Sequence, residues 1–82
     1  MISCVILHFA EVRERCGTAR ESVDVSPGAT LEDLWSLLLQ RHPGLREARF
    51  KPTPCRNRRV ASWDDAVAAG DEVAFLMPVS GG

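Results

Sequence analysis

The residues best suited to chemistry stand at the end of the chain, where Val79-Ser80-Gly81-Gly82 follows Pro78. Neither glycine has a Cβ, so a narrow channel of another protein could admit the bare backbone, and the last carbonyl carbon is open to attack once activated. Four extended residues reach at most about 14 Å, which is enough to carry the terminal carboxylate into a partner's cleft. The alternative interpretations are a frayed terminus or a cloning remnant. A Gly-Gly ending alone does not decide among these.

Side chains that commonly perform catalysis occur here without a supporting motif. The sequence has no Gly-rich phosphate loop, no His-Glu-x-x-His and no Gly-x-Ser-x-Gly, so phosphoryl transfer, zinc hydrolysis and serine hydrolysis have no anchor. His8 falls in an apolar run and His42 at an expected helix end, which favours a satisfied core histidine and a helix-dipole partner. The acid pairs at 64–65 and 71–72 are expected in solvated turns. We therefore expect a protein that is not an enzyme on its own.

The three cysteines, Cys4, Cys16 and Cys55, form an odd set without C-x-x-C spacing. This pattern argues against both a disulfide framework and a zinc site, so we expect no metal. Cys4 is expected to be a buried small hydrophobe, and Cys16, near a loop, is the thiol most suspected of exposure. Reduced thiols, with no secretory pattern and no apolar run long enough for a membrane, predict a cytoplasmic protein.

The length of 82 residues allows one domain, and a domain of this size needs its whole interior to hold itself together. A deep private active site is therefore not expected, and a binding or carrier role is favoured. Residues 41–60 hold seven basic groups against Glu47 alone. Because no aromatic residues alternate with these arginines, a solvated face or an acidic protein partner is favoured over nucleic acid.

The apolar pattern predicts a strand, then a turn, then a helix. Residues 2–9 are apolar on both alternating faces, which is typical of a central strand. Residues 11–15 are expected to form a short connection closed by Gly17, and residues 21–25 a half-buried strand that pairs with the first. The Pro-Gly pair within 26–29 favours a type II turn.

A helix is expected near residues 31–42. Thr30 is a good N-cap, and Asp33 three residues later completes a shortened capping box. The helix should end at His42-Pro43-Gly44, with Gly44 as a left-handed cap. Its core stripe has helical spacing and consists of Leu31, Leu34, Trp35 and Leu38.

The second half of the chain is expected to be less regular. Pro52 and Pro54 make residues 45–56 an edge or a loop, residues 62–69 should form a short helical turn capped by Gly70, and residues 72–77 a final strand. Trp63 is expected to seal one end of the core. The order predicts an α+β protein, a β-grasp roll with a mixed sheet and one main helix. It would comprise one domain over residues 1–78 and a flexible tail over residues 79–82.

Three segments of the chain form a recognisable pattern: residues 9–14 (FAEVRE) with Gly17, residues 70–74 (GDEVA) and residues 78–82 (PVSGG). In order and position they resemble segments of the molybdopterin synthase small subunit, a ubiquitin-like sulfur carrier. Asn57 also falls where that family has an asparagine, and residues 27–30 match its turn before the helix.

The resemblance implies a cycle that takes place at Gly82. An adenylating enzyme of the ubiquitin-activating kind would use ATP and magnesium to form an acyl-adenylate, and a sulfur donor would displace AMP. The resulting thiocarboxylate would enter the molybdopterin synthase large subunit and donate sulfur to a cyclic pyranopterin precursor. The catalytic side chains would belong to that large subunit, and this chain would bind no cofactor itself.

The resemblance also implies a docking surface made by Phe9, Arg13, Val60 and Leu76, with Pro78, Val79, Ser80 and Gly81 in the inserted tail. Leu76 should then lie on an exposed face, while Val73 and Phe75 point into the core. Two departures stand out: Met77 occupies the place of a usual proline, and residues 51–54 replace the family's apolar lead-in to its third strand.

Other pathways use the same fold and ending. Similar carriers supply sulfur for thiamin thiazole, for cysteine or for tRNA thiolation, and a ubiquitin-like interaction module is a further alternative. The ending Val-Ser-Gly-Gly and the Arg13-Glu14 segment favour the molybdopterin branch.

Overall fold

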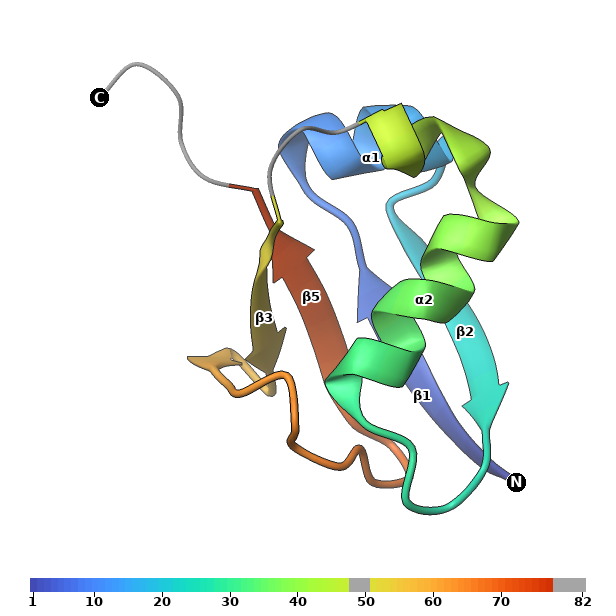
Figure 1. The fold of residues 1–82 in the computed structure, drawn as a ribbon, viewed down its shortest axis with the longest axis vertical. Helices are drawn as coiled ribbons and strands as arrows, with labels where there is room; N and C mark the ends of the chain where they lie inside the picture. Colours follow the sequence, from blue (N-terminus) through green and yellow to red (C-terminus); the bar gives the residue numbers. More distant parts are fainter. Residues whose placement is uncertain (48–50, 78–82) are drawn as a thin grey trace.

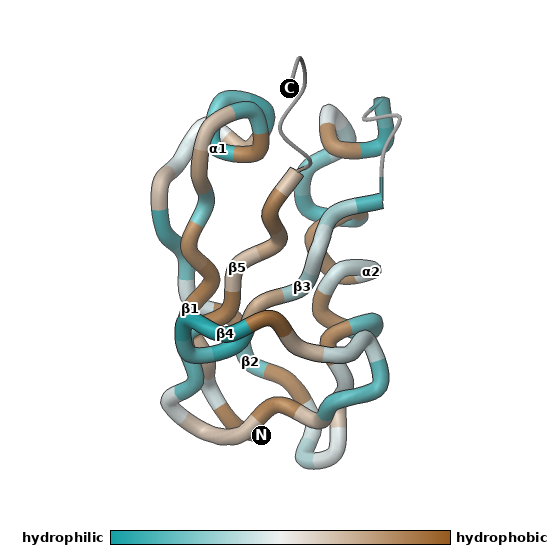
Figure 2. The backbone as a smooth tube through the Cα atoms, turned by 90° about the vertical axis from the view of Figure 1, so that its left-hand side faces the viewer, coloured by the Kyte–Doolittle hydropathy of each residue, from teal (hydrophilic) through white to brown (hydrophobic). Residues whose placement is uncertain are grey.

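The computed structural model describes residues 1–47 and 51–77. A five-stranded mixed sheet in the order β2-β1-β5-β3-β4 forms one layer, and helix α2 packs across one of its faces (Figures 1 and 2). The result is the α+β β-grasp roll predicted from the sequence. The elements are β1 (Ile2–Leu7), α1 (Ala10–Cys16), β2 (Arg20–Val25), α2 (Leu31–Arg41), the 3₁₀ helix η1 (Pro43–Glu47), β3 (Thr53–Arg56), β4 (Arg59–Val60) and β5 (Glu72–Leu76).

Strand β1 is central, as its apolar pattern predicts. It pairs antiparallel with β2 from Ile2 opposite Val25 to Leu7 opposite Arg20, and parallel with β5 on its other side. Its inward side chains Cys4 and Ile6 are fully buried beneath α2. Its outward side chains, Val5 and Leu7, are only half-buried, because no helix of the described residues covers that face (Figure 2).

Helix α2 begins with the predicted capping box. The Thr30 hydroxyl accepts the Asp33 backbone N–H at 3.3 Å, and the Asp33 carboxylate accepts the Thr30 N–H at 2.9 Å. The predicted stripe is buried, with Trp35 packing against Phe75 at a ring-centroid distance of 5.1 Å. Trp63 stacks on Phe75 at 5.6 Å and lies 6.5 Å from Trp35, so the three rings cluster and Trp63 closes one end of the core as expected.

Replacing Leu38 by Ala should lower the free energy of unfolding by about 2 to 5 kcal/mol, because Leu38 is fully buried under the sheet and its loss leaves a cavity. Urea unfolding of the variant measures this change. Gln40→Ala, on the exposed side of the same helix, should change stability by less than about 0.5 kcal/mol. Equal effects of the two substitutions would contradict the assigned packing.

The connection predicted at 11–15 is wrong, because these residues belong to helix α1. An i,i+4 ion pair joins Arg15 to Glu11 at 2.7 Å, Val12 is buried, and Gly17 ends the helix with φ of 76°. One buried apolar residue in seven is too weak a period to distinguish a short helix from a charged loop.

Helix α2 ends where it was predicted to end, but the residue that caps it differs from the prediction. The C-cap is His42, with φ of −126° and its N–H bonded to the Leu38 carbonyl, and Gly44 does not adopt positive φ. The chain continues directly into η1, where Leu45 is buried. The chain therefore stays helical past Pro43, because this conformation buries Leu45.

Residues 62–69 form turns and an isolated bridge to Thr30 rather than the predicted helical turn. Their carbonyl groups instead accept the first free N–H groups of α2: Leu31 donates to Asp65 at 3.0 Å and Glu32 donates to Trp63 at 3.1 Å. Satisfying these N–H groups competes with forming a helix locally. Gly70 does take the predicted left-handed conformation, with φ of 82°.

Residues 45–56, expected as an edge or a loop, include a four-residue strand beside the edge of the sheet. Strand β3 pairs with β5 along its length, whereas β4 pairs only with Cys55 and Arg56. Pro52 lies before the strand, and Pro54 lies outside the part that β4 covers. Among the described residues, no helix is long and apolar enough to cross a membrane.

Candidate functional site

The predicted site residues fall into two groups. Gly82, Gly81, Ser80, Val79 and Pro78 lie outside the described residues, so their placement stays a prediction. The four predicted docking residues, by contrast, are all described.

The face of the sheet opposite α2 carries the predicted docking surface. Side chains that pair across a sheet share a face, and the register aligns Leu7 with Ala74, Ala74 with Cys55, and Cys55 with Val60. Leu76 lies two residues after Ala74 and therefore points the same way. This face is crossed by apolar side chains from four strands.

Strand β5 alternates as predicted between this open face and the core. Val73 and Phe75 are 0% and 1% exposed, whereas Leu76 is 39% exposed. Among residues 1–47 and 51–77, the exposed large hydrophobic residues are Phe9, Val60, Leu76 and Met1. The exposure of the predicted apolar docking residues is thus confirmed, while their role stays a prediction.

A groove of about 260 Å³ runs along this face between the end of β1 and the β3–β5 pair. Phe9 and Leu76 line it together, so two of the predicted docking residues meet. Its surface is mostly apolar, with Arg58 and Glu72 as its charged members. The full lining is Leu7, Phe9, Cys55, Arg58, Glu72, Val73, Ala74 and Leu76.

The other two predicted residues line separate hollows. Val60 lines a shallow one at the β3–β4 hairpin with Arg59, and Arg13 lines another beside α1 with Thr18. Val60 and Arg13 therefore do not line the groove itself, although the register places Val60 on the same face of the sheet. Arg13 lies in helix α1, where the sequence predicted a short connection.

A buried carboxylate fixes the hairpin that borders the groove. Asp71 accepts hydrogen bonds from Arg56 at 2.8 Å, from the Asn57 amide at 3.0 Å and from the Ala68 N–H at 2.7 Å. Asn57 in turn accepts the Glu72 N–H at 3.0 Å. The solvated turn expected at 71–72 is thus wrong for Asp71, which is only 7% exposed.

The same contacts set the titration of this carboxylate. Burial alone would raise the pKa of Asp71, but the hydrogen bonds from Ala68 and Asn57 and the adjacent Arg56 guanidinium outweigh burial and hold the pKa below its ordinary value. Asn57 and Arg58 both have positive φ, 51° and 69°, which is the conformation of a two-residue hairpin turn. The network therefore holds a tight turn that presents Arg58 to the groove.

Asp71→Asn should destabilise the fold by about 1.5 to 3 kcal/mol at neutral pH, because it removes charge-assisted hydrogen bonds to a buried group. A carboxylate with a lowered folded-state pKa stabilises above its unfolded pKa of about 3.9, and that stability is lost as pH falls through the folded-state pKa. The difference between variant and parent should therefore shrink in acid. Urea unfolding at neutral and acidic pH measures it, with the exposed Asp64→Asn as control. Equal losses in the two variants would refute the assignment.

Sequence reasoning missed most of the groove lining. Leu7, Cys55, Arg58, Glu72 and Ala74 were not predicted as site residues. The apolar side chains on the outward face of residues 2–9 could have indicated the groove, but they were interpreted as part of a strand buried on both faces. In the structure Leu7 is half-buried and Phe9 is exposed, and both line the groove.

A β-grasp roll with its longer helix across one face of the sheet and an open apolar groove on the other has the architecture of the small ubiquitin-like proteins. The ThiS family model matches residues 6–82. The chain is 37% identical, over 100% of both chains, to the molybdopterin synthase sulfur carrier subunit of Mycobacterium tuberculosis. The chain therefore belongs to the ThiS family of small sulfur carriers.

Two further proteins are similar to this chain in sequence or in fold. Small archaeal modifier protein 1 of Haloferax volcanii is also 37% identical, over 90% of this chain and 94% of the relative, and its crystal structure matches with a TM-score of 0.85 at 35% identity, over 98% and 99% of the two chains. The complex of subunits 1 and 2 of the molybdopterin-converting factor from Helicobacter pylori includes a chain that matches with a TM-score of 0.70 at 20% identity, over 99% and 100%. That last likeness is one of fold.

Proposed function

We propose that this chain is the sulfur carrier subunit of a molybdopterin synthase and that Gly82 carries the sulfur as a thiocarboxylate. The observation that carries the proposal is the position of the groove. Leu76, the last residue of β5, lines it, and the segment ending in Gly81-Gly82 follows one residue later in the sequence. A partner that docks on the open sheet face would therefore receive the start of the tail at the edge of the same interface.

The chemistry at Gly82 requires two activated steps. The carboxylate attacks the α-phosphate of magnesium-bound ATP in an adenylating enzyme, which forms an acyl-adenylate and releases pyrophosphate. A sulfur nucleophile then attacks the acyl carbon and AMP leaves, giving a thiocarboxylate. This chain supplies the acyl group and the docking surface, while the partners supply the catalytic side chains.

The final transfer would take place in the large subunit. The thiocarboxylate sulfur would attack a carbon of the cyclic pyranopterin precursor, and an oxygen substituent would leave that carbon with the bonding electrons. Water would then hydrolyse the resulting thioester, which leaves the sulfur on the pterin and restores the Gly82 carboxylate. A dithiolene holds two sulfur atoms, so two charged carriers are consumed for each product. The apolar lining of the groove suits such repeated use, because apolar contacts allow a carrier to dock and leave without breaking buried ion pairs.

A second candidate is a protein modifier whose activated Gly82 is joined to lysine amines. The observation that favours it is the likeness to small archaeal modifier protein 1, which equals the likeness to the Mycobacterium tuberculosis carrier subunit at 37% identity. Sulfur supply to thiamin thiazole, cysteine or tRNA would use the same first two steps.

Reconstitution separates these functions. The thiocarboxylated chain is mixed with a molybdopterin synthase large subunit and the cyclic precursor, and dithiolene product is followed by chromatography and mass spectrometry. The proposal predicts two thiocarboxylates consumed per product. Absence of product together with ATP-dependent lysine conjugates in the presence of the adenylating enzyme would overturn it in favour of the modifier.

A further inference from the structure

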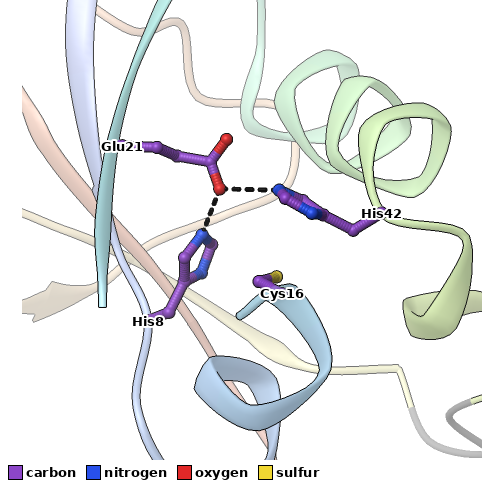
Figure 3. A group of neighbouring side chains, drawn as sticks. All are labelled: His8, Cys16, Glu21 and His42. Carbon is purple, nitrogen blue, oxygen red and sulfur yellow. Dashed lines mark hydrogen bonds and ion pairs between the residues drawn. The ribbon is translucent and has the colours of Figure 1, made fainter. Parts of the chain in front are cut away.

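Four potential metal ligands meet between the helices and the first two strands: His8, Cys16, Glu21 and His42. Each comes from a different place in the chain, namely just after β1, the end of α1, the start of β2 and the C-cap of α2. Their donor atoms all lie within 4.8 Å of one another. Figure 3 shows both imidazole rings directed at the Glu21 carboxylate, with the Cys16 side chain beside them.

One carboxylate oxygen joins the two rings. Glu21 Oε2 lies 2.6 Å from His8 Nε2 and 2.8 Å from His42 Nε2, and the rings stand nearly perpendicular with centroids 6.1 Å apart. The other oxygen, Oε1, accepts a hydrogen bond from Arg41 at 3.1 Å. Arg41 therefore orients the carboxylate from outside, as partners of metal-bound carboxylates commonly do, and leaves Oε2 to the cluster.

The polar atoms of the cluster are not all satisfied by the protein. His8 is 2% exposed, and its Nδ1 has no hydrogen-bond partner among the described residues. The expectation of a satisfied core histidine is thus wrong for this atom. His8 is thus buried with Nδ1 unpaired within the described part of the chain, and its Nε2 is bonded to a carboxylate oxygen that the His42 ring also contacts. Burying such incompletely paired polar groups is costly.

Two imidazoles, one thiol and one carboxylate are a donor set suited to zinc, which takes nitrogen, sulfur and oxygen ligands in a tetrahedron. With zinc-to-ligand distances of about 2.0 to 2.3 Å, tetrahedral ligand atoms stand about 3.3 to 3.6 Å apart. The two hydrogen-bonded pairs must therefore open slightly, and the widest pair must close by about 1 Å. A thiolate and a carboxylate also balance the two charges of the ion.

We propose that His8, Cys16, Glu21 and His42 bind a zinc-like divalent cation in a four-coordinate structural site. The ion replaces the protons shared at Glu21 Oε2 and joins α1 and the end of α2 to β1 and β2. The Cys16 thiol gives its proton to solvent when the metal–sulfur bond forms. A closed site of four protein ligands serves to stabilise a small domain and does not depend on the carrier function.

Titration of the purified, reduced full-length chain with Co²⁺ tests the site, because tetrahedral Co²⁺ has intense visible bands and a thiolate ligand adds a near-ultraviolet charge-transfer band. The proposal predicts one ion bound per chain with both features, displacement by one equivalent of Zn²⁺, and a higher melting temperature with Zn²⁺ than without. Cys16→Ser should remove the charge-transfer band, and Cys16→Ser and His42→Gln should each weaken binding by about 100-fold or more.

The matched control is Cys55→Ser, which removes a different thiol. Cys55 is buried and lies outside the cluster. It should bind Co²⁺ like the parent chain. A cooperative melting transition of each metal-free variant shows that the variant is folded. If either Cys16→Ser or His42→Gln does not fold, the other variant still tests the site. No stoichiometric binding to the parent, or binding unchanged in both Cys16→Ser and His42→Gln, would overturn the proposal and leave a hydrogen-bonded polar cluster only.

Discussion

Deleting Gly82 should abolish sulfur transfer and leave the unfolding midpoint unchanged. The acyl carbon that the adenylating enzyme activates belongs to this residue, so nothing remains at the right reach once it is removed. The buried core of the described residues runs from Cys4 to Phe75, and the deletion takes no side chain from it. Activity falls to background while urea unfolding of the two chains coincides.

Extending the chain by one residue past Gly82 should be as damaging as the deletion. The extension places the reactive carbonyl in a peptide bond and moves the new terminus by about 3.5 Å from where a partner's site expects it. Gly81→Val keeps the carboxylate in place but adds a branched side chain, so it should slow transfer without abolishing it. Full activity of the deleted chain would show that Gly82 is not the chemical site.

Leu76→Glu should produce the second large effect, a loss of docking on the large subunit of about 30-fold or more with little change in melting temperature. Leu76 lines the groove and is 39% exposed, so a charge there remains hydrated in the free protein but is desolvated against a partner. Loss of a central apolar contact costs about 2 kcal/mol or more in an interface, which corresponds to this factor.

Ser36→Glu supplies the matched control for Leu76→Glu. Ser36 lies exposed on α2, the helix on the opposite side of the sheet from the groove (Figure 2), and the substitution adds the same charge. Calorimetric binding of both variants and their melting curves measure the comparison. If the folded Leu76→Glu chain binds as tightly as Ser36→Glu, the open sheet face is not the docking surface.

Elements with a strong local period were predictable from the sequence. Helix α2 could be predicted because Thr30 and Asp33 complete a capping box and Leu38 continues an apolar stripe, so local propensity and tertiary burial agree. Strands β1 and β5 were predictable for the same reason. The family resemblance, together with the alternation of β5, also predicted that Leu76 would be exposed beside buried Phe75.

Features that depend on distant segments were not predictable. Residues 62–69 contain a helical capping pattern, yet their carbonyls bond to the start of α2, which is far away in sequence. Asp71 looked like a surface acid because its partners Arg56 and Asn57 belong to the β3–β4 hairpin, fourteen or more residues earlier in the sequence. The groove was missed because one strand's apolar pattern does not show which face a helix will cover.

The His8, Cys16, Glu21 and His42 cluster shows the same limitation. Metal motifs are recognised by short spacings such as C-x-x-C, and here each ligand comes from a different element. Helix α1, where a short connection was predicted, is what brings Cys16 to the cluster. Spacing along the sequence therefore does not reveal a set of side chains that tertiary structure brings together.

Intact-mass spectrometry of the chain after incubation with a cognate adenylating enzyme, ATP, magnesium and a sulfur donor tests the central claim most directly. Conversion of the Gly82 carboxylate to a thiocarboxylate replaces one oxygen by sulfur, a gain of about 16 Da. The account predicts this gain on the native chain and its absence from the chain lacking Gly82 and from the chain extended by one residue. A native chain that keeps its original mass with an adenylating enzyme active on its own carrier would contradict the sulfur-carrier account.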